Sequence, residues 1–209
     1  MRIKYALMAD ELNRLLTVLP VKSEWAVLDI GCGPIRPYSF ILTDKFRKCF
    51  GFDYNLKILK GQTFDTCRKH GVHIFQGNIE KMAFRNGSFD LVICNDMLAY
   101  TNKKKSLSEI YRVLRQGGYC ISLFNNTSAY SWYKIFHPFK FYPIEVIHSC
   151  LVLINTVIFM KFNKRFFHTT FNTNHELKSL IDTLPVNKSD LWIDKNFTDY
   201  PVLNFIFQK

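Results

Sequence analysis

Two glycines, Gly31 and Gly33, follow directly on a mostly apolar run at residues 27–30, and no other feature of the chain constrains its fold as strongly. A short apolar run that ends in glycines predicts a buried strand entering a tight turn. Because glycine has no Cβ, the backbone of such a turn can approach a ligand closely. The run therefore predicts a ligand site beside the turn. A glycine turn without a ligand remains the alternative on these residues alone.

Asp29 indicates which ligand the turn would accept. It stands two positions before Gly31, at the lip of the expected crevice, where its carboxylate would repel a pyrophosphate. The dinucleotide fingerprint also needs a third glycine, and Arg36 occupies that position. A nucleoside with a cationic tail fits this arrangement, and S-adenosylmethionine (SAM) is the obvious candidate.

A second acidic residue, Asp53, ends the next apolar run, 24 positions after Asp29. A carboxylate at the end of the second strand of such a fold can accept hydrogen bonds from ribose hydroxyls. The alternative is a helix cap for the segment that follows. Asp53 is therefore a candidate for holding the sugar of a nucleoside.

Strand and helix patterns alternate along the chain, which predicts a doubly wound, mainly parallel sheet. Further strands are expected at residues 49–53, 72–75, 88–95, 119–124, 188–194 and 202–208. Helices are expected at residues 5–18, 37–45, 55–70, 104–115 and 174–184. Gly117 and Gly118 are expected to close the helix at 104–115.

In order and spacing, the motifs of residues 25–124 resemble those of the class I SAM-dependent methyltransferases that act on small molecules. The resemblance implies a Rossmann-like, seven-stranded α/β sheet, mostly parallel, whose antiparallel last strand lies between the fifth and sixth. It implies one methyltransferase domain over residues 1–209. Its parts are a helical cap (1–24), a cofactor-binding core (25–125), an aromatic-rich helical lid or substrate insertion after strand five (126–171), and a last helix with two strands (172–209).

The resemblance also assigns residues to the cofactor. Asp29, Gly31 and Gly33 would surround the methionine part of SAM, Asp53 would hold its ribose, and Asn95 would lie beside its sulfonium. Asn78 and Ile79 would contact the adenine; the family usually has an aspartate at Asn78, but asparagine keeps an acceptor oxygen. The expected cofactor set is Asp29, Gly31, Cys32, Gly33, Asp53, Tyr54, Asn78, Ile79 and Asn95.

Composition and motif spacing indicate the cellular compartment of the protein and whether it binds a metal. The six cysteines form no Cys-x-x-Cys pair, and several lie in apolar runs, which favours buried free thiols in a reducing compartment. The N-terminal residues lack a signal-peptide pattern, and no His, Asp or Glu set has metal-ligand spacing. We therefore expect a cytoplasmic protein, with peripheral membrane contact as an open alternative, and no metal site.

The formal net charge of +11 raises the question of nucleic acid. Apart from short clusters at residues 45–48 and 103–105, the basic residues are spread among acidic ones. This distribution favours a diffuse positive electrostatic field over a groove that binds nucleic-acid phosphates. Residues 95–98 also lack the Asp/Asn-Pro-Pro-Tyr motif of methylases that act on base amines. A nucleic-acid partner is therefore not expected, although RNA methylation stays an alternative.

The insertion at 126–171 holds 12 of the 33 aromatic residues of the chain. Residues 146–160 carry no charge, and Lys161, Lys164 and Arg165 follow them. We expect a helical lid that packs on the sheet and forms the pocket wall. Contact with a membrane surface through residues 142–165 and a transmembrane span are the alternatives, although a bilayer needs about 20 apolar residues.

An aromatic lid suits a bulky or apolar substrate. The sequence thus predicts an enzyme that methylates a small hydrophobic or aromatic molecule, on oxygen rather than nitrogen or carbon, and releases S-adenosylhomocysteine. A hydroxyl acceptor would use a general base, for which His137 and Tyr100 are the leading candidates, with His148 and His168 behind them. The expected substrate set is Met97, Tyr100, Trp132, Tyr133 and His137. A non-catalytic protein of the same fold, binding a partner or membrane through this segment, is the alternative.

Overall fold

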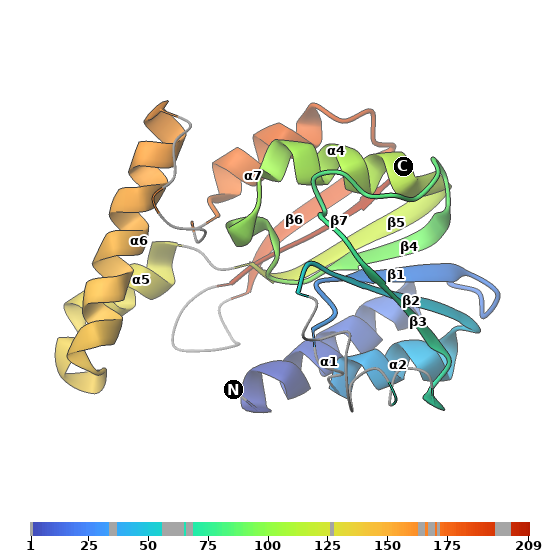
Figure 1. The fold of residues 1–209 in the computed structure, drawn as a ribbon, viewed down its shortest axis with the longest axis horizontal. Helices are drawn as coiled ribbons and strands as arrows, with labels where there is room; N and C mark the ends of the chain where they lie inside the picture. Colours follow the sequence, from blue (N-terminus) through green and yellow to red (C-terminus); the bar gives the residue numbers. More distant parts are fainter. Residues whose placement is uncertain are drawn as a thin grey trace.

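A seven-stranded sheet runs through the computed structural model in the order β3-β2-β1-β4-β5-β7-β6 (Figure 1). The first five strands pair in parallel, and β7 runs antiparallel between β5 and β6. The predicted fold class is thereby confirmed. The structure describes residues 2–33, 37–55, 65, 69–125, 128–162, 166, 170, 172–194 and 202–209.

Most strands lie close to the predicted positions because they are short, largely apolar runs bounded by polar or glycine residues. All five residues of β1 are buried, as expected for a central strand of a parallel sheet. The strands are β1 (Ala26–Ile30), β2 (Lys48–Asp53), β3 (Val72–Gln76), β4 (Phe89–Cys94), β5 (Leu114–Asn125), β6 (Lys188–Asp194) and β7 (Val202–Gln208).

Helices cover both faces of the sheet, as a doubly wound fold requires (Figure 1). On one face, α1 (Arg2–Val18) and α2 (Pro37–Lys45) pack through side chains such as Leu12 and Leu42. On the other, α4 (Lys103–Val113) and α7 (Asn174–Asp182) pack through side chains such as Leu107 and Leu177. These four helices lie close to the predicted ranges. The helix predicted at 55–70 falls largely outside the described residues.

The junction of α4 and β5 differs from the prediction. The helix ends at Val113, and Leu114 is already extended (φ −68°, ψ 139°) because its fully buried side chain belongs to the first pair of the strand, opposite Phe89. Pairing then shifts and resumes at Tyr119. Gly117, at φ +78°, lies within this irregularity. The two glycines therefore serve a bulge in β5 and do not cap the helix.

The insertion after β5 forms a helical hairpin of α5 (Ser128–Phe136), the short 3-10 helix η3 (Pro138–Lys140) and α6 (Pro143–Phe162). Its two helices pack on each other and stand to one side of the sheet (Figure 1). The expected lid on the sheet is therefore wrong for the described residues of the hairpin. Within those parts of the chain that the structure describes, no helix is long and apolar enough to cross a membrane.

The end of the insertion returns to the sheet beside η2 (Leu98–Tyr100), the 3-10 turn that follows β4. The backbone N–H of Thr170 donates to the carbonyl of Ala99 at 2.8 Å, and the Thr170 hydroxyl donates to the same oxygen at 3.0 Å. The far end of the insertion is thus anchored at the carboxyl end of β4.

Candidate functional site

A cavity of about 430 Å³ lies at the carboxyl ends of β1 and β2 and beside the turn that follows β4. In an open α/β sheet, ligands bind where the strand order reverses, and here β1 is paired with β2 on one side and β4 on the other. The cavity is lined by Ile30, Gly31, Phe52, Asp53, Tyr54, Gly77, Asn78, Ile79, Glu80, Met97, Tyr100 and Thr101. Its position and size make it the candidate ligand site.

The glycine turn forms one wall of the cavity and depends on the absence of side chains. Gly31 and Gly33 have φ values of +71° and +56°, in the left-handed region that favours glycine. A Cβ on Gly31 would lie 2.3 Å from Sδ of Met97 and 2.5 Å from its Cγ. The Gly31 N–H donates to the Phe52 carbonyl at 2.7 Å, which holds the turn against β2.

Asp53 connects this turn to the end of β2. Its Oδ2 accepts the Gly33 N–H at 3.0 Å, and its Oδ1 accepts the Asn55 N–H at 2.8 Å. Each carboxylate oxygen can accept a further hydrogen bond, so the group can still receive the hydroxyls of a ribose. The position of Asp53 therefore suits the predicted sugar contact.

The opposite wall follows β3. Gly77 is required there because a Cβ would lie 2.6 Å from Cζ of Phe52. Asn78 folds the next turn by accepting the Glu80 N–H on Oδ1 at 2.8 Å, while Glu80 accepts the Asn102 N–H at 2.7 Å. Asn102 is also the N-cap of α4, so this wall is fixed to the start of that helix.

The tip of β4 supplies polar groups near the cavity. Asn95 is buried, and its Oδ1 accepts the Leu123 N–H at 2.9 Å; its Nδ2 has no partner among the described residues. Asp96 follows with φ +54°, an unusual conformation for a residue other than glycine. This strained corner turns the chain toward Met97 and Tyr100, which both line the cavity.

The phenol of Tyr100 has a raised pKa, first because it is partly buried and second because the Asp96 carboxylate is close. Tyr100 lines the cavity, where its phenol can donate a hydrogen bond to a ligand. The raised pKa makes the phenolate less accessible and so disfavours Tyr100 as a general base.

The charges around the cavity are all of one sign. Asp53 and Glu80 line it, and its described lining residues include no lysine or arginine. A phosphate would meet only repulsion from these side chains, whereas a cationic ligand would be attracted. The cavity therefore fits the predicted sulfonium nucleoside and not a dinucleotide.

Three of the predicted cofactor residues face away from the larger cavity. Asp29, Cys32 and Gly33 line a much smaller neighbouring space on the α2 side of β1. Asp29 is buried there and not at the lip of the crevice, because its side chain follows Val27 to the α1–α2 face of the sheet. Burial, and second the nearby Asp29 carboxylate, raises the pKa of the Cys49 thiol to about 11. Asp29 thus lies outside the lining of the larger cavity.

The predicted residues of the insertion are not brought to the cavity. Trp132, Tyr133 and His137 belong to the hairpin, which packs on itself. The His137 ring stacks on Tyr133 with centroids 4.5 Å apart, and its Nδ1 lies 3.0 Å from the Tyr133 carbonyl oxygen. His137 is therefore not placed to act as the base. His148 lies exposed on α6, and His168 lies outside the described residues, as does Arg36.

Sequence reasoning missed five lining residues: Ile30, Phe52, Gly77, Glu80 and Thr101. Gly77 carried a usable signal, since a glycine between a strand and a polar turn often marks a close approach. Glu80 and Thr101 carried none, because the loops that fold them toward the cavity have no regular pattern.

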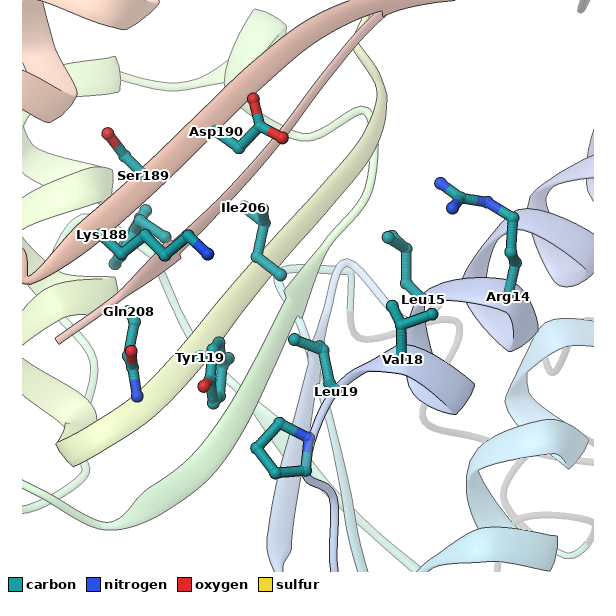
Figure 2. A pocket seen from close by; sticks show the side chains of 12 residues that line it. Arg14, Leu15, Val18, Leu19, Tyr119, Lys188, Ser189, Asp190, Ile206 and Gln208 are labelled. Atoms are coloured by element: carbon teal, nitrogen blue, oxygen red, sulfur yellow. The ribbon is translucent and has the colours of Figure 1, made fainter.

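A second cavity, of about 500 Å³, lies between the end of α1 and strands β5, β7 and β6 (Figure 2). It is lined by Leu15, Val18 and Ile206 together with polar groups such as Arg14 and Asp190. No residue predicted for the cofactor or the substrate lines it. It also has no lining residue from β1, β2 or β4, at whose carboxyl ends the first cavity lies, so it is not the candidate site.

The fold and the cavity together define a nucleoside-binding α/β domain of methyltransferase type, and comparison with known proteins agrees. A family profile described as "Methyltransferase domain" matches residues 28–122. The uncharacterised protein MJ0638 of Methanocaldococcus jannaschii is 31% identical over 161 residues, which cover 74% of this chain and 68% of that protein. The malonyl-[acyl-carrier protein] O-methyltransferase of a Marinomonas species is 28% identical over 53% of this chain and 42% of its own length.

Solved structures show the same fold. YcgJ of Bacillus subtilis superimposes with a TM-score of 0.66 at 13% identity, covering 96% of this chain and 98% of that one. Magnesium protoporphyrin IX methyltransferase from Synechocystis, solved with bound SAH, gives a TM-score of 0.66 at 12% identity, covering 99% and 84%. The chain belongs to the class I SAM-dependent methyltransferases, and SAM is the cofactor of that family.

Proposed function

We propose that this protein transfers the methyl group of SAM to a small hydrophobic or aromatic molecule, on an oxygen atom in preference to nitrogen or carbon. The observation that carries the proposal is the cavity at the strand ends, whose glycine turn admits a close ligand and whose only charged described lining groups are Asp53 and Glu80. Attraction of a cation and exclusion of phosphate follow from those two carboxylates.

The residues of the cavity have distinct parts in this proposal. Asp53 accepts the ribose hydroxyls, and the turn at Asn78 and Ile79 receives the adenine. SAM, when bound, supplies a methyl group already activated on a positively charged sulfur. Ile79, Met97 and Phe52 provide apolar surface that keeps water from the reacting atoms, so that much of the rate gain comes from positioning.

The preference for oxygen rests on a donor in the turn that follows β4. The Tyr100 phenol lines the cavity and can orient an oxygen atom by donating a hydrogen bond to it. No histidine is among the described lining residues. A phenol or a carboxylate needs no strong base, and the positive sulfonium of bound SAM would offset the repulsion of its anion by Asp53 and Glu80. The O-methyltransferase name of the Marinomonas relative is consistent with this preference.

Calorimetry tests the cofactor site. SAM and S-adenosylhomocysteine are expected to bind, NAD is not, and Asp53→Asn is expected to weaken SAM binding by about 1–3 kcal/mol through the lost charged acceptor. Asp44→Asn, which removes an exposed carboxylate on α2, is the matched control and should bind SAM like the wild type. Binding of NAD, or equal SAM affinity in both variants, would contradict the assignment.

Product analysis tests the acceptor. The protein is incubated with SAM carrying a labelled methyl group and a panel of phenols, aromatic carboxylic acids and amines of similar size. Label is expected in ethers or esters. Label confined to amines or to carbon atoms would overturn the preference for oxygen while leaving the cofactor site intact.

A further inference from the structure

The α5–α6 hairpin exposes large apolar side chains at its turn. Phe136, Tyr142 and Ile144 are 71%, 77% and 70% exposed, and Phe139 is fully exposed. Single exposed apolar residues are ordinary on protein surfaces, but four within nine consecutive positions are not. The turn therefore presents an apolar tip.

The outer face of α6 continues this surface. Ile147, Leu151, Ile154 and Val157 are all exposed, and their spacing of three or four residues places them on one side of the helix. An apolar stripe on a helix of a water-soluble protein normally faces the core. In α6 it faces outward.

Polar groups occupy the inner side of the hairpin. Lys134 is only 7% exposed, and its Nζ lies 3.3 Å from Oε1 of Glu145 across the two helices. Asn155 and Thr156 of α6 are buried as well, and Thr156 donates to the Val152 carbonyl at 2.8 Å. Apart from Val152, the described buried side chains of the hairpin are thus polar, while large apolar side chains are exposed, which is the arrangement of a segment whose partner is an apolar medium.

The remaining charges indicate which apolar medium fits. Glu145 is the sole carboxylate between residues 128 and 162, and it is paired with the buried Lys134. Lys140 and Lys161, at the two ends of this surface, are both exposed, and the chain carries a net charge of +11. A second copy would bring these like charges together, whereas an anionic lipid headgroup layer complements them.

We propose that the turn of the hairpin and the outer face of α6 dock on the surface of an anionic lipid bilayer. The exposed side chains of Phe136, Phe139 and Ile144 enter the boundary between headgroups and acyl chains, and Lys140 and Lys161 lie at the level of the lipid phosphates. Trp132, which is half-exposed on α5, suits the same boundary because it combines an apolar ring with a donor. The inference concerns binding and does not depend on the proposed methyl transfer.

Vesicle flotation with the full chain tests the proposal. The protein is mixed with vesicles of phosphatidylcholine alone and with vesicles that also contain phosphatidylglycerol, without SAM. Binding is expected to the anionic vesicles and to weaken as salt is raised. Phe136→Ser combined with Phe139→Ser is expected to lower the partition coefficient about tenfold or more, because two large apolar groups no longer enter the bilayer.

The matched control is Val18→Ser, which removes an apolar side chain that is 68% exposed on α1, outside the hairpin. It should bind vesicles like the wild type, and circular dichroism checks that each variant is folded. Equal binding of the double variant and the wild type, absence of binding, or equal binding to both vesicle types would overturn the proposal. Sedimentation without lipid gives a further test. If the wild type forms a dimer and the double variant is a monomer, the surface binds a second copy of the chain and the proposal is overturned.

Discussion

Substitution of Gly31 tests the geometry of the cavity. A side chain there has two free-energy costs, backbone strain and overlap with Met97, and these can be measured separately. An alanine at φ +71° is strained by about 1–2 kcal/mol. Alanine also restricts the unfolded chain more than glycine does, which stabilises the folded state by about 0.4–1 kcal/mol and offsets part of the strain. The new Cβ would also lie 2.3 Å from Sδ of Met97, so the Met97 side chain must move, at a typical overpacking cost of about 1–3 kcal/mol.

Gly71 provides the control for the first cost. It has the same φ of +71°, but a Cβ built on it would meet no atom within 4 Å. Gly71→Ala therefore measures the backbone strain alone, and Gly31→Ala is expected to lose about 1–3 kcal/mol more free energy of unfolding. In a Met97→Ala background this excess should disappear, as a double-mutant cycle would show.

Urea unfolding gives the free energies, and calorimetry with SAM gives the functional consequence. Because Met97 lines the cavity, its displacement in the Gly31→Ala variant is expected to weaken SAM binding about tenfold or more, whereas Gly71→Ala leaves the affinity unchanged. If Gly31→Ala and Gly71→Ala lose the same stability and keep the same affinity, the close approach of the turn to Met97 is not a feature of the protein.

Three further changes address the adenine contact, the acid limit of stability and the acceptor site. Asn78→Asp is expected to raise SAM affinity about threefold to tenfold, since a charged acceptor strengthens a hydrogen bond to the adenine amino group; unchanged calorimetric affinity would place the adenine elsewhere. The hydrogen bond from Arg112 lowers the pKa of Glu109. The ionised carboxylate therefore stabilises the fold at pH values above the ordinary glutamate pKa of ~4.3. This stabilisation is lost as the pH falls through the lowered pKa. The wild type should therefore lose more stability on acidification than Glu109→Gln in urea titrations at several pH values, and parallel curves would count against this. Tyr100→Phe is expected to lower kcat about tenfold through a lost hydrogen bond, whereas His137→Ala changes it less than about twofold; the reverse order would restore His137 as the base.

The parts of the fold that could be predicted from the sequence are those set by local pattern. Each strand is a short apolar run that ends at a glycine or a polar residue, and such runs are recognised without knowledge of their neighbours. The end of α4 is different, since Leu114 leaves the helix to pair with Phe89, a residue far away in the chain. A helix that carries on to Gly117 satisfies local propensity equally well. Tertiary pairing decides the boundary.

The candidate site divides in the same way. Gly31 and Asp53 were recognised because each stands at the carboxyl end of a predicted strand, where the fold directs it to the cavity, whereas Asn78 was assigned through the family resemblance. Glu80 reaches the cavity through a turn made by the Asn78 side chain, and Thr101 through the 3-10 turn after β4. Such turns are fixed by particular hydrogen bonds and leave no periodic signal in the sequence.

The hairpin shows where pattern fails for a deeper reason. Apolar residues stand on every side of α6, so the periodicity of its sequence does not tell which face is buried. In water, we would expect Asn155 and Thr156 to be exposed and Ile147 and Ile154 to be buried. Removing apolar surface from water is favourable by about 25 cal/mol per Å². The structure has the opposite arrangement, and the transfer free energy of the outer face is therefore not used in folding the isolated chain.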